Sequence, residues 1–330
     1  MNIPWNVSIV NTGLGLGSKT IANNSLVEKM LHDGLARPEK IVNSIGIKNR
    51  YIVGEKEDHE FLVKKSLDQT SWAKKTKPPI LLCVCTQTDP ISIPSLARRA
   101  VSNLEISGEV HVIQIHSGCT GFIEILSIVN AQLEINGLEN AIIINADILS
   151  NLIDSSDWTN SLLFSDGAVS TIIERSPQKH AIYDTVHFDN SGCLNLNLTE
   201  AKYSMNGLNT FTFTAIEVEK ALARLASEAE KLKIEISTIL LHQASMQIIS
   251  MISLAAARFF PSAKLPTNIS TRGNLNSASI PALVHDNISY LKNSKRSHYT
   301  AFLGFGAGLC VTYLAVPNTT FRNYTVEKCT

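Results

Sequence analysis

Strand-like and helix-like segments alternate along almost the whole chain of 330 residues. Short apolar runs of strand length are followed by longer segments with apolar residues three or four positions apart. The expected strands are 7–12, 80–86, 110–115, 140–146, 168–174, 237–241 and 299–316, and the expected helices are 22–32, 57–71, 93–104, 119–135, 214–233 and 243–258. Residues 257–299 are rich in Asn, Ser and Pro and predict an irregular connection. The alternation itself predicts an α/β fold with partly parallel sheets.

The length and the charge of the chain limit which classes of protein it can belong to. A chain of 330 residues predicts two domains or one large α/β unit. Only 18% of residues are charged, which favours a large buried core and a subunit interface. The 29 basic and 29 acidic residues cancel, so a nucleic-acid-binding function is not expected.

Segments that would direct the chain to a membrane or out of the cell are also not expected. No apolar run approaches the ~20 residues that cross a bilayer. The first residues show neither a basic stretch nor a sustained apolar one, so a signal peptide is not indicated. Six cysteines are too sparse for a disulfide scaffold and are typical of reduced thiols. We therefore expect a cytoplasmic protein.

The chain also contains an internal echo. Residues 79–104 run as an apolar strand, a polar turn and a helix, and residues 236–256 follow the same plan. Two halves of related plan would place the two turns close together, at the carboxyl ends of strands. Open α/β sheets assemble their sites at such ends.

Cys119 is the strongest candidate for a nucleophile. It follows His-Ser-Gly at the end of an apolar strand and opens the helix expected at 119–135. Free N–H groups and the positive end of the dipole favour a thiolate on the first turn of a helix. The alternative is a buried structural thiol, the commoner fate of a free cysteine.

His242 and Asn274 are candidate partners of Cys119. His242 ends the strand expected at 237–241, and Asn274 lies in a glycine-containing loop. Cysteine, histidine and asparagine would supply a nucleophile, a proton donor or acceptor, and a neutral hydrogen-bond partner for a substrate oxygen. A structural histidine and an ordinary connecting loop remain the alternatives. The chain has no spacing typical of a metal site, so no metal is expected.

Six segments resemble the thiolase fold, and specifically the family of β-ketoacyl-acyl-carrier-protein synthase III. They occur in the family's order and are TGLGLGSKTIANNSL, SGCTGF, LLFSDGAVSTII, LLHQAS, GNLNSAS and GFGAGLC. The resemblance implies two similar halves, 1–175 with the nucleophile and 176–330 with His and Asn, in a five-layered αβαβα arrangement.

The resemblance also implies roles for individual residues. Cys119 would carry an acyl group as a thioester, and His242 and Asn274 would polarise the carbonyl of a malonyl- or β-ketoacyl-type thioester. The backbone N–H groups of Cys119 and Ala307 would form the oxyanion hole, and Phe211 would lie near the substrate entrance. Acyl-coenzyme A or acyl-carrier-protein thioesters would be the substrates, with no cofactor.

The chain departs from the family pattern at the substrate entrance. Lys40 and Ser44 stand where the family has a tryptophan and an arginine, and Trp158 replaces an arginine. Ser245 replaces the asparagine of the histidine motif, and Gln247 replaces a basic residue. A specialised biosynthetic enzyme with an unusual acyl donor or acceptor is therefore expected. The same replacements weaken the case for docking of an acidic carrier protein.

The residues also bear on the type of reaction. Relatives that do not decarboxylate use a glutamate base at positions where this chain has Gln87 or Ile93. Decarboxylative condensation is therefore preferred. Two alternatives stay open: transfer of the acyl group to an O or N nucleophile, and a non-catalytic partner subunit of a related synthase. A homodimer is expected, with a heterodimer as its alternative.

Overall fold

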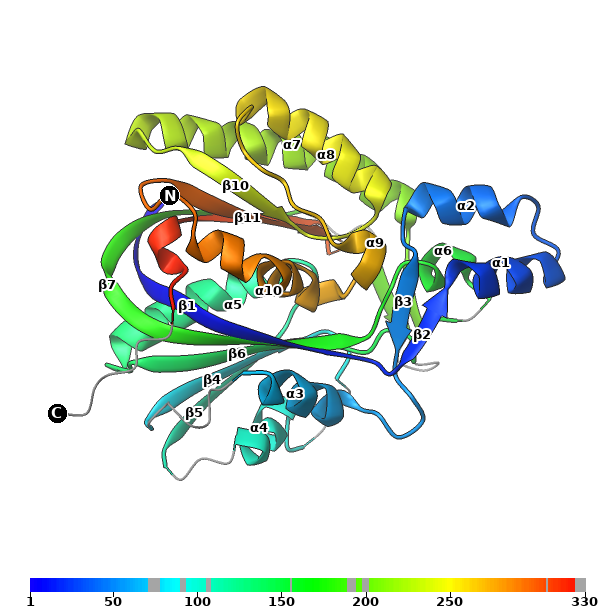
Figure 1. Ribbon diagram of the computed structural model, residues 1–330, viewed down its shortest axis with the longest axis horizontal. Helices are drawn as coiled ribbons and strands as arrows, with labels where there is room; N and C mark the ends of the chain where they lie inside the picture. The colour runs from blue at the N-terminus through cyan, green and yellow to red at the C-terminus, as the bar shows by residue number, and fades with distance from the viewer. Residues whose placement is uncertain are drawn as a thin grey trace.

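A computed structural model describes residues 1–70, 78–89, 93–104, 108–154, 156–188, 194–197, 202–306 and 308–323. Figure 1 shows five layers, in which helices cover the outer faces of two parts of a sheet and further helices lie between them. The outer helices are α3 (His59–Asp68) and α4 (Leu96–Ala100) on one side, and α7 (Gly207–Leu232) and α8 (Met246–Phe259) on the other. The helices between the sheets are α5 (Gly121–Ile135) and α10 (Ser279–Lys292). The expected αβαβα arrangement is confirmed.

Eight strands form the main sheet. They are β1 (Asn2–Leu16), β4 (Ile80–Thr86), β5 (Val110–His116), β6 (Asn140–Asp147), β7 (Gly167–His187), β10 (Ile236–Leu241), β11 (Tyr299–Gly306) and β12 (Cys310–Pro317). Their order is β10-β11-β12-β7-β6-β4-β5, and β1 pairs with β7. Strands β4, β5 and β6 are mutually parallel, as are β10 and β11, so the partly parallel sheet expected from the sequence is present.

The strand β7 belongs to both parts of the sheet. Its first residues pair with β1 and β6, and its last residues, 182–187, pair with β12. In Figure 1 it curves around one end of the molecule from one part of the sheet to the other. The division expected between residues 175 and 176 falls inside this strand, and the two halves stay a prediction.

The helix α5 is buried because it is apolar on nearly every side. Phe122, Ile123, Ile125, Leu126 and Val129 are all fully buried, and the helix contacts β4, β6, β11 and β12. A helix that is hydrophobic all round is typical of a protein interior. This burial fixes the start of α5, and with it Cys119, in the middle layer.

The outer helix α7 follows its expected stripe with one difference. Val218, Leu222, Leu225 and Ala229 are buried, whereas Leu232 is 38% exposed because the helix ends there. The helix also begins seven residues before the expected position 214. The Asn206 side chain caps it by accepting a hydrogen bond from the Asn209 N–H at 3.0 Å.

Two expectations about the C-terminal third are wrong. Residues 257–299 are not irregular throughout, since they contain the short helix α9 (Ile269–Arg272) and the 14-residue helix α10. The stretch 299–316 is not one strand but two, β11 and β12, which pair antiparallel. The Ser, Asn and Pro residues of α10 disfavoured a helix in the sequence pattern. Packing of α10 against β1 and β10 stabilises it.

A smaller unit lies beside the layers, on the right in Figure 1. It consists of elements that the sequence pattern did not single out, apart from the expected helix at 22–32. They are β2 (Lys19–Ala22), α1 (Asn23–His32), α2 (Pro38–Ile45), β3 (Asn49–Ile52) and α6 (Trp158–Ser161). A further hairpin pairs β8 (Leu194–Asn197) with β9 (Lys202–Met205). Among the described residues, no helix is long and apolar enough to span a bilayer.

Candidate active site

One pocket of about 440 Å³ brings together side chains from strand ends that are distant in the sequence. Gln87 follows β4, Cys119 follows β5 and His242 follows β10, while Asn274 lies in the loop between α9 and α10. All four line the pocket. The internal echo is therefore confirmed in one respect, since the turns after β4 and β10 meet at one site.

Cys119 lies two residues before α5, which begins at Gly121, and not on the first turn of the helix as the sequence predicts. Gly121 N–H donates to the carbonyl of Gly118 at 2.9 Å, which closes the turn between β5 and the helix. The thiol is partly exposed to the pocket. Burial in these surroundings, with Cys310 and Asp147 nearby, raises the pKa of the Cys119 thiol. Burial therefore favours the protonated form of the thiol.

His242 is a neutral imidazole that is buried and closely packed. The residue is 1% exposed, and its backbone N–H donates to the carbonyl of Leu303 at 2.9 Å. The ring of Phe305 packs against it edge to face at 5.5 Å. Burial lowers the pKa of His242 to about 3. Its Nδ1 atom is buried and has no hydrogen-bond partner among the described residues.

Asn274 is held by its amide oxygen. Its Oδ1 accepts hydrogen bonds from the Asn276 N–H at 2.9 Å and the Ser279 hydroxyl at 3.2 Å. The backbone of Asn274 is fixed by hydrogen bonds to Leu163 and Ser165. With the oxygen occupied, Nδ2 is the atom left to donate to a substrate oxygen.

The sequence reasoning missed a buried carboxylate that joins two loops of the site. Asp147, at the end of β6, is fully buried. Its Oδ1 accepts from the Gln87 N–H at 2.7 Å, and its Oδ2 accepts from the Ser277 N–H at 3.1 Å. Burial raises the pKa of Asp147 to about 6, against these hydrogen bonds. A carboxylate directly after an otherwise apolar strand was the signal that could have found it.

Asn276 was also missed, although it lies within the segment GNLNSAS. It occupies the left-handed region, with φ of 52°, which asparagine tolerates better than most residues. Its Nδ2 donates to Gln87 Oε1 at 2.8 Å. In the sequence, Gln87 is notable only as the residue that replaces a glutamate base.

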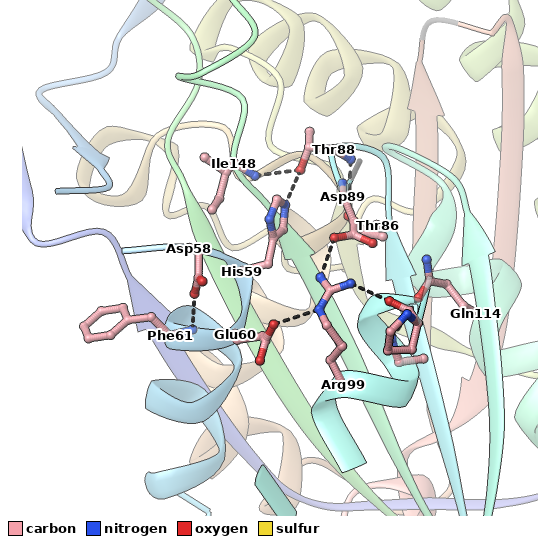
Figure 2. A network of polar contacts seen from close by, with 12 residues as sticks. Asp58, His59, Glu60, Phe61, Thr86, Thr88, Asp89, Arg99, Gln114 and Ile148 are labelled. Carbon is pink, nitrogen blue, oxygen red and sulfur yellow. Dashed lines mark hydrogen bonds and ion pairs between the residues drawn. The ribbon is translucent and has the colours of Figure 1, made fainter. Parts of the chain in front are cut away.

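A second polar network supports the turn that carries Gln87 (Figure 2). Arg99, from α4, donates to Asp89 at 2.8 Å and to Glu60 at 2.7 Å. His59 Nε2 lies 2.8 Å from the Thr88 hydroxyl, which also donates to Asp147 at 3.2 Å. The turn is thereby fixed from the side opposite the pocket.

The residues expected at the substrate entrance divide into two groups. Phe211 and Trp158 line the pocket, as do Ser245 and Gln247. Lys40 and Ser44 are exposed on α2 and do not line it. The neighbouring residues Ile41 and Ile45 line it instead, because adjacent helix positions point about 100° apart.

The oxyanion hole is described only in part. Ala307 lies outside the described residues. Gly306 lines the pocket beside Cys119, and a Cβ atom at Gly306 would lie 2.9 Å from Cys119 Cβ and Sγ. The bare glycine backbone is what allows β11 to approach the nucleophile.

The pocket is mostly apolar. None of the described residues that line it is Lys, Arg, Asp or Glu. Within the part of the chain that the structure describes, no group of three His, Cys, Asp or Glu side chains could hold a metal ion. The free cysteines 83, 85 and 310 are buried, and Cys193 and Cys329 lie outside the described residues.

Two protein-family models match two segments of the chain that contribute residues to the pocket. The model described as 3-oxoacyl-[acyl-carrier-protein (ACP)] synthase III matches residues 113–192, which include Cys119. The model of its C-terminal part matches residues 227–316, which include His242 and Asn274.

Individual relatives agree over nearly the full length. The β-ketoacyl-[acyl-carrier-protein] synthase III of Aquifex aeolicus is 28% identical over 314 residues, which cover 91% of this chain and 96% of that protein. The Synechocystis enzyme of the same name is 26% identical over 315 residues, covering 89% and 94%.

Solved structures show the same fold. A 3-oxoacyl-(acyl-carrier protein) synthase from Burkholderia xenovorans superimposes with a TM-score of 0.83 at 21% identity, covering 98% of this chain and 99% of that one. The priming β-ketosynthase of the R1128 polyketide pathway gives 0.76 at 19% identity, covering 96% and 97%. With both family models matched in order and the catalytic segments in one pocket, this chain belongs to the 3-oxoacyl-[acyl-carrier-protein] synthase III family of thiolase-fold condensing enzymes.

Proposed function

We propose that this protein forms a β-ketoacyl product by decarboxylative Claisen condensation, with Cys119 as the acyl carrier. The observation that carries the proposal is the meeting of Cys119, neutral His242 and the Asn274 amide in one apolar pocket. The family's reaction uses acyl thioesters and no metal or cofactor.

The first half-reaction loads the enzyme. Cys119 sulfur attacks the carbonyl of the donor thioester, the donor C–S bond breaks, and the thiol proton leaves with the released thiolate. The Cys119 N–H is one candidate donor to the oxyanion, and removing such a donor typically lowers the rate ~10²–10³-fold.

The second half-reaction makes the carbon–carbon bond. The malonyl-type carboxylate leaves as CO₂, its bonding electrons form an enolate, and the enolate carbon attacks the acyl-Cys119 carbonyl. The enzyme sulfur departs as a thiolate and takes up a proton. The Asn274 Nδ2 and the His242 Nε2 donate to the thioester oxygen on which the enolate charge develops.

The apolar lining favours loss of CO₂. A carboxylate loses hydration on entering a pocket whose described lining residues include no cationic side chain. Carbon dioxide is neutral and loses much less. The pocket therefore destabilises the substrate carboxylate relative to the products of decarboxylation.

The substrates are proposed to be those of a specialised pathway. The pocket lacks a cationic group at Trp158, Ser245 and Gln247, where phosphate or an acidic carrier protein would be held. We expect slow condensation of acetyl-coenzyme A with malonyl carrier protein, and efficient turnover of this pair would contradict the proposal. Coenzyme A thioesters and carrier-protein thioesters stay open as donors.

We infer that two copies associate along β5. Dimers are typical of this family. β5 is the edge strand of the sheet, and residues 110–115 are only half buried despite their apolar character. A heterodimer with a related synthase is the alternative. The cytoplasmic location stays a prediction.

Intact-protein mass spectrometry with a panel of acyl thioesters tests the function. An acyl adduct is expected on the wild-type protein and not on Cys119→Ala. A decarboxylated, extended product should then form with malonyl thioester. Acylation without carbon–carbon bond formation would favour transfer to an O or N nucleophile, and no adduct at all would leave only the role of a non-catalytic partner.

A further inference from the structure

One side-chain amide contacts the nucleophile, and a second amide contacts the first. The Cys119 thiol donates a hydrogen bond to Asn276 Oδ1 at 3.5 Å, a normal range for sulfur. The other end of that amide, Nδ2, donates to Gln87 Oε1 at 2.8 Å. Both amide oxygens also approach Gly118, where an added Cβ would lie 2.7 Å from Gln87 Oε1 and 3.2 Å from Asn276 Oδ1.

The surrounding contacts fix how the Asn276 amide points. Its backbone N–H is held by Asn274 Oδ1, and the next residue, Ser277, is held by Asp147. Asp147 also holds the backbone of Gln87, so one carboxylate sets the spacing of the two amides. Asn276 is fully buried and has no room to turn its side chain toward solvent.

The chemistry of the pair follows from its polarity. An amide oxygen accepts hydrogen bonds and cannot donate them. Because Gln87 Oε1 occupies Nδ2, the end of Asn276 that meets the sulfur is the oxygen. That oxygen stabilises a thiol and repels a thiolate. The contact therefore acts on the protonation state of Cys119, in the same direction as burial.

We propose that Asn276, oriented by Gln87, is a positioning residue that keeps the Cys119 thiol protonated and aimed at the amide until an acyl thioester enters the pocket. The proposal rests on Cys119 being the nucleophile of the proposed function. During loading the S–H bond breaks, the new S–C bond forms, and the proton leaves with the released donor thiolate. The acylated sulfur has no proton, so the contact with Asn276 ends when the acyl group is loaded.

The rate of Cys119 alkylation by iodoacetamide, followed by mass spectrometry from pH 6 to 10, tests the proposal. This measurement needs no condensation, so its outcome is independent of the proposed reaction. Cys119→Ala gives the background from the other cysteines. The midpoint of the pH profile reports the thiol pKa, while the plateau at high pH reports access.

Asn276→Ala and Asn276→Asp are expected to move the profile in opposite directions. Loss of the acceptor should make alkylation at pH 8 about fivefold faster, which corresponds to ~1 kcal/mol. A carboxylate at the same place should make it slower and raise the midpoint. A merely structural role would move both variants the same way, and that result, or two unchanged midpoints, would overturn the proposal.

A second pair of variants keeps the test decisive if Asn276 variants fold poorly. Gln87→Leu removes the acceptor that orients Asn276, so alkylation should become faster, though less than for Asn276→Ala. Gln87→Glu retains that acceptor and should be no faster than wild type. Equal rates for Gln87→Leu and Gln87→Glu would contradict the orienting role of Gln87.

Discussion

The backbone of Gly306 lies against the side chain of Cys119, close enough that a Cβ atom at Gly306 would sit 2.9 Å from both Cβ and Sγ of the cysteine. Real Cβ atoms essentially never show such contacts below 3.0 Å. The nucleophile thus has its position set by β11, a strand of the opposite part of the sheet from β5.

Gly306→Ala is therefore expected to displace the thiol and slow acylation by about 100-fold, the effect of roughly 1 Å of misplacement. Stopped-flow acylation measures it. In a Cys119→Gly background the added methyl group meets no side chain, so Gly306→Ala should then cost little stability in urea unfolding. An equal cost in both backgrounds would show that the clash lies elsewhere.

The pKa of His242, lowered to about 3 from its ordinary value near 6.5, predicts a pH dependence of stability. Below pH 6.5 the His242 side chain is protonated in the unfolded chain but stays neutral in the folded protein. His242 therefore lowers the free energy of unfolding progressively as the pH falls from 6.5 toward 3. His242→Gln should lose less stability than wild type over this range in urea titrations at pH 7, 5 and 4. Parallel curves would contradict the neutral state of His242.

Asp147→Asn is expected to lower kcat because the new amide cannot accept from both the Gln87 and the Ser277 backbone. Asp166→Asn is the matched control, since Asp166 is equally buried but binds Ser150 and Val53 instead. Both variants should be destabilised. Only Asp147→Asn should also change the pH midpoint of Cys119 alkylation, and a shift in both would argue for a general loosening.

Phe211→Ala should widen the pocket and lower the KM for donors with longer acyl chains. Phe211 is 39% exposed and lines the pocket. Leu208 lies one turn earlier on the same helix, is 75% exposed and does not line it. Leu208→Ala should therefore leave the chain-length profile unchanged. Steady-state kinetics over C2 to C12 acyl thioesters would reveal a profile that shifts with neither or with both variants.

Gln247→Lys should restore a cation at the pocket. An acidic carrier protein should then show a lower KM as an acceptor, and the gain should disappear at high salt because the attraction is screened. The KM for a small pantetheine thioester is the control and should not change. A gain that persists in 0.5 M salt would exclude an electrostatic origin.

The strands could be predicted from the sequence where they are buried on both faces. The run 80–86 is apolar because β4 lies between β5 and β6 and is covered by helices, so every residue of it is buried. The helix α10 could not be predicted in the same way. Its second half is polar, and its stability comes from packing against β1 and β10.

Some residues of the site could also be predicted from the sequence, and others could not. Cys119, His242 and Asn274 could be predicted because each lies in a recognisable segment, and the structure brings all three to one pocket. The pairing of Gln87 with Asn276 spans 189 positions and depends on two loops that meet at Asp147. A local sequence pattern does not predict a contact between two such distant loops. The roles assigned to individual site residues stay predictions.

The continuity of β7 has a consequence for how activity arises during folding. This strand pairs with β1 and β6 at one end and with β12 at the other, and β12 in turn positions β11 beside Cys119. A chain cut between residues 175 and 176 would sever the strand that joins the part of the sheet with the cysteine to the part with the histidine. Thiol chemistry at Cys119 should therefore emerge in a single step with the completed sheet, and a partly folded or nicked enzyme should carry no residual condensing activity.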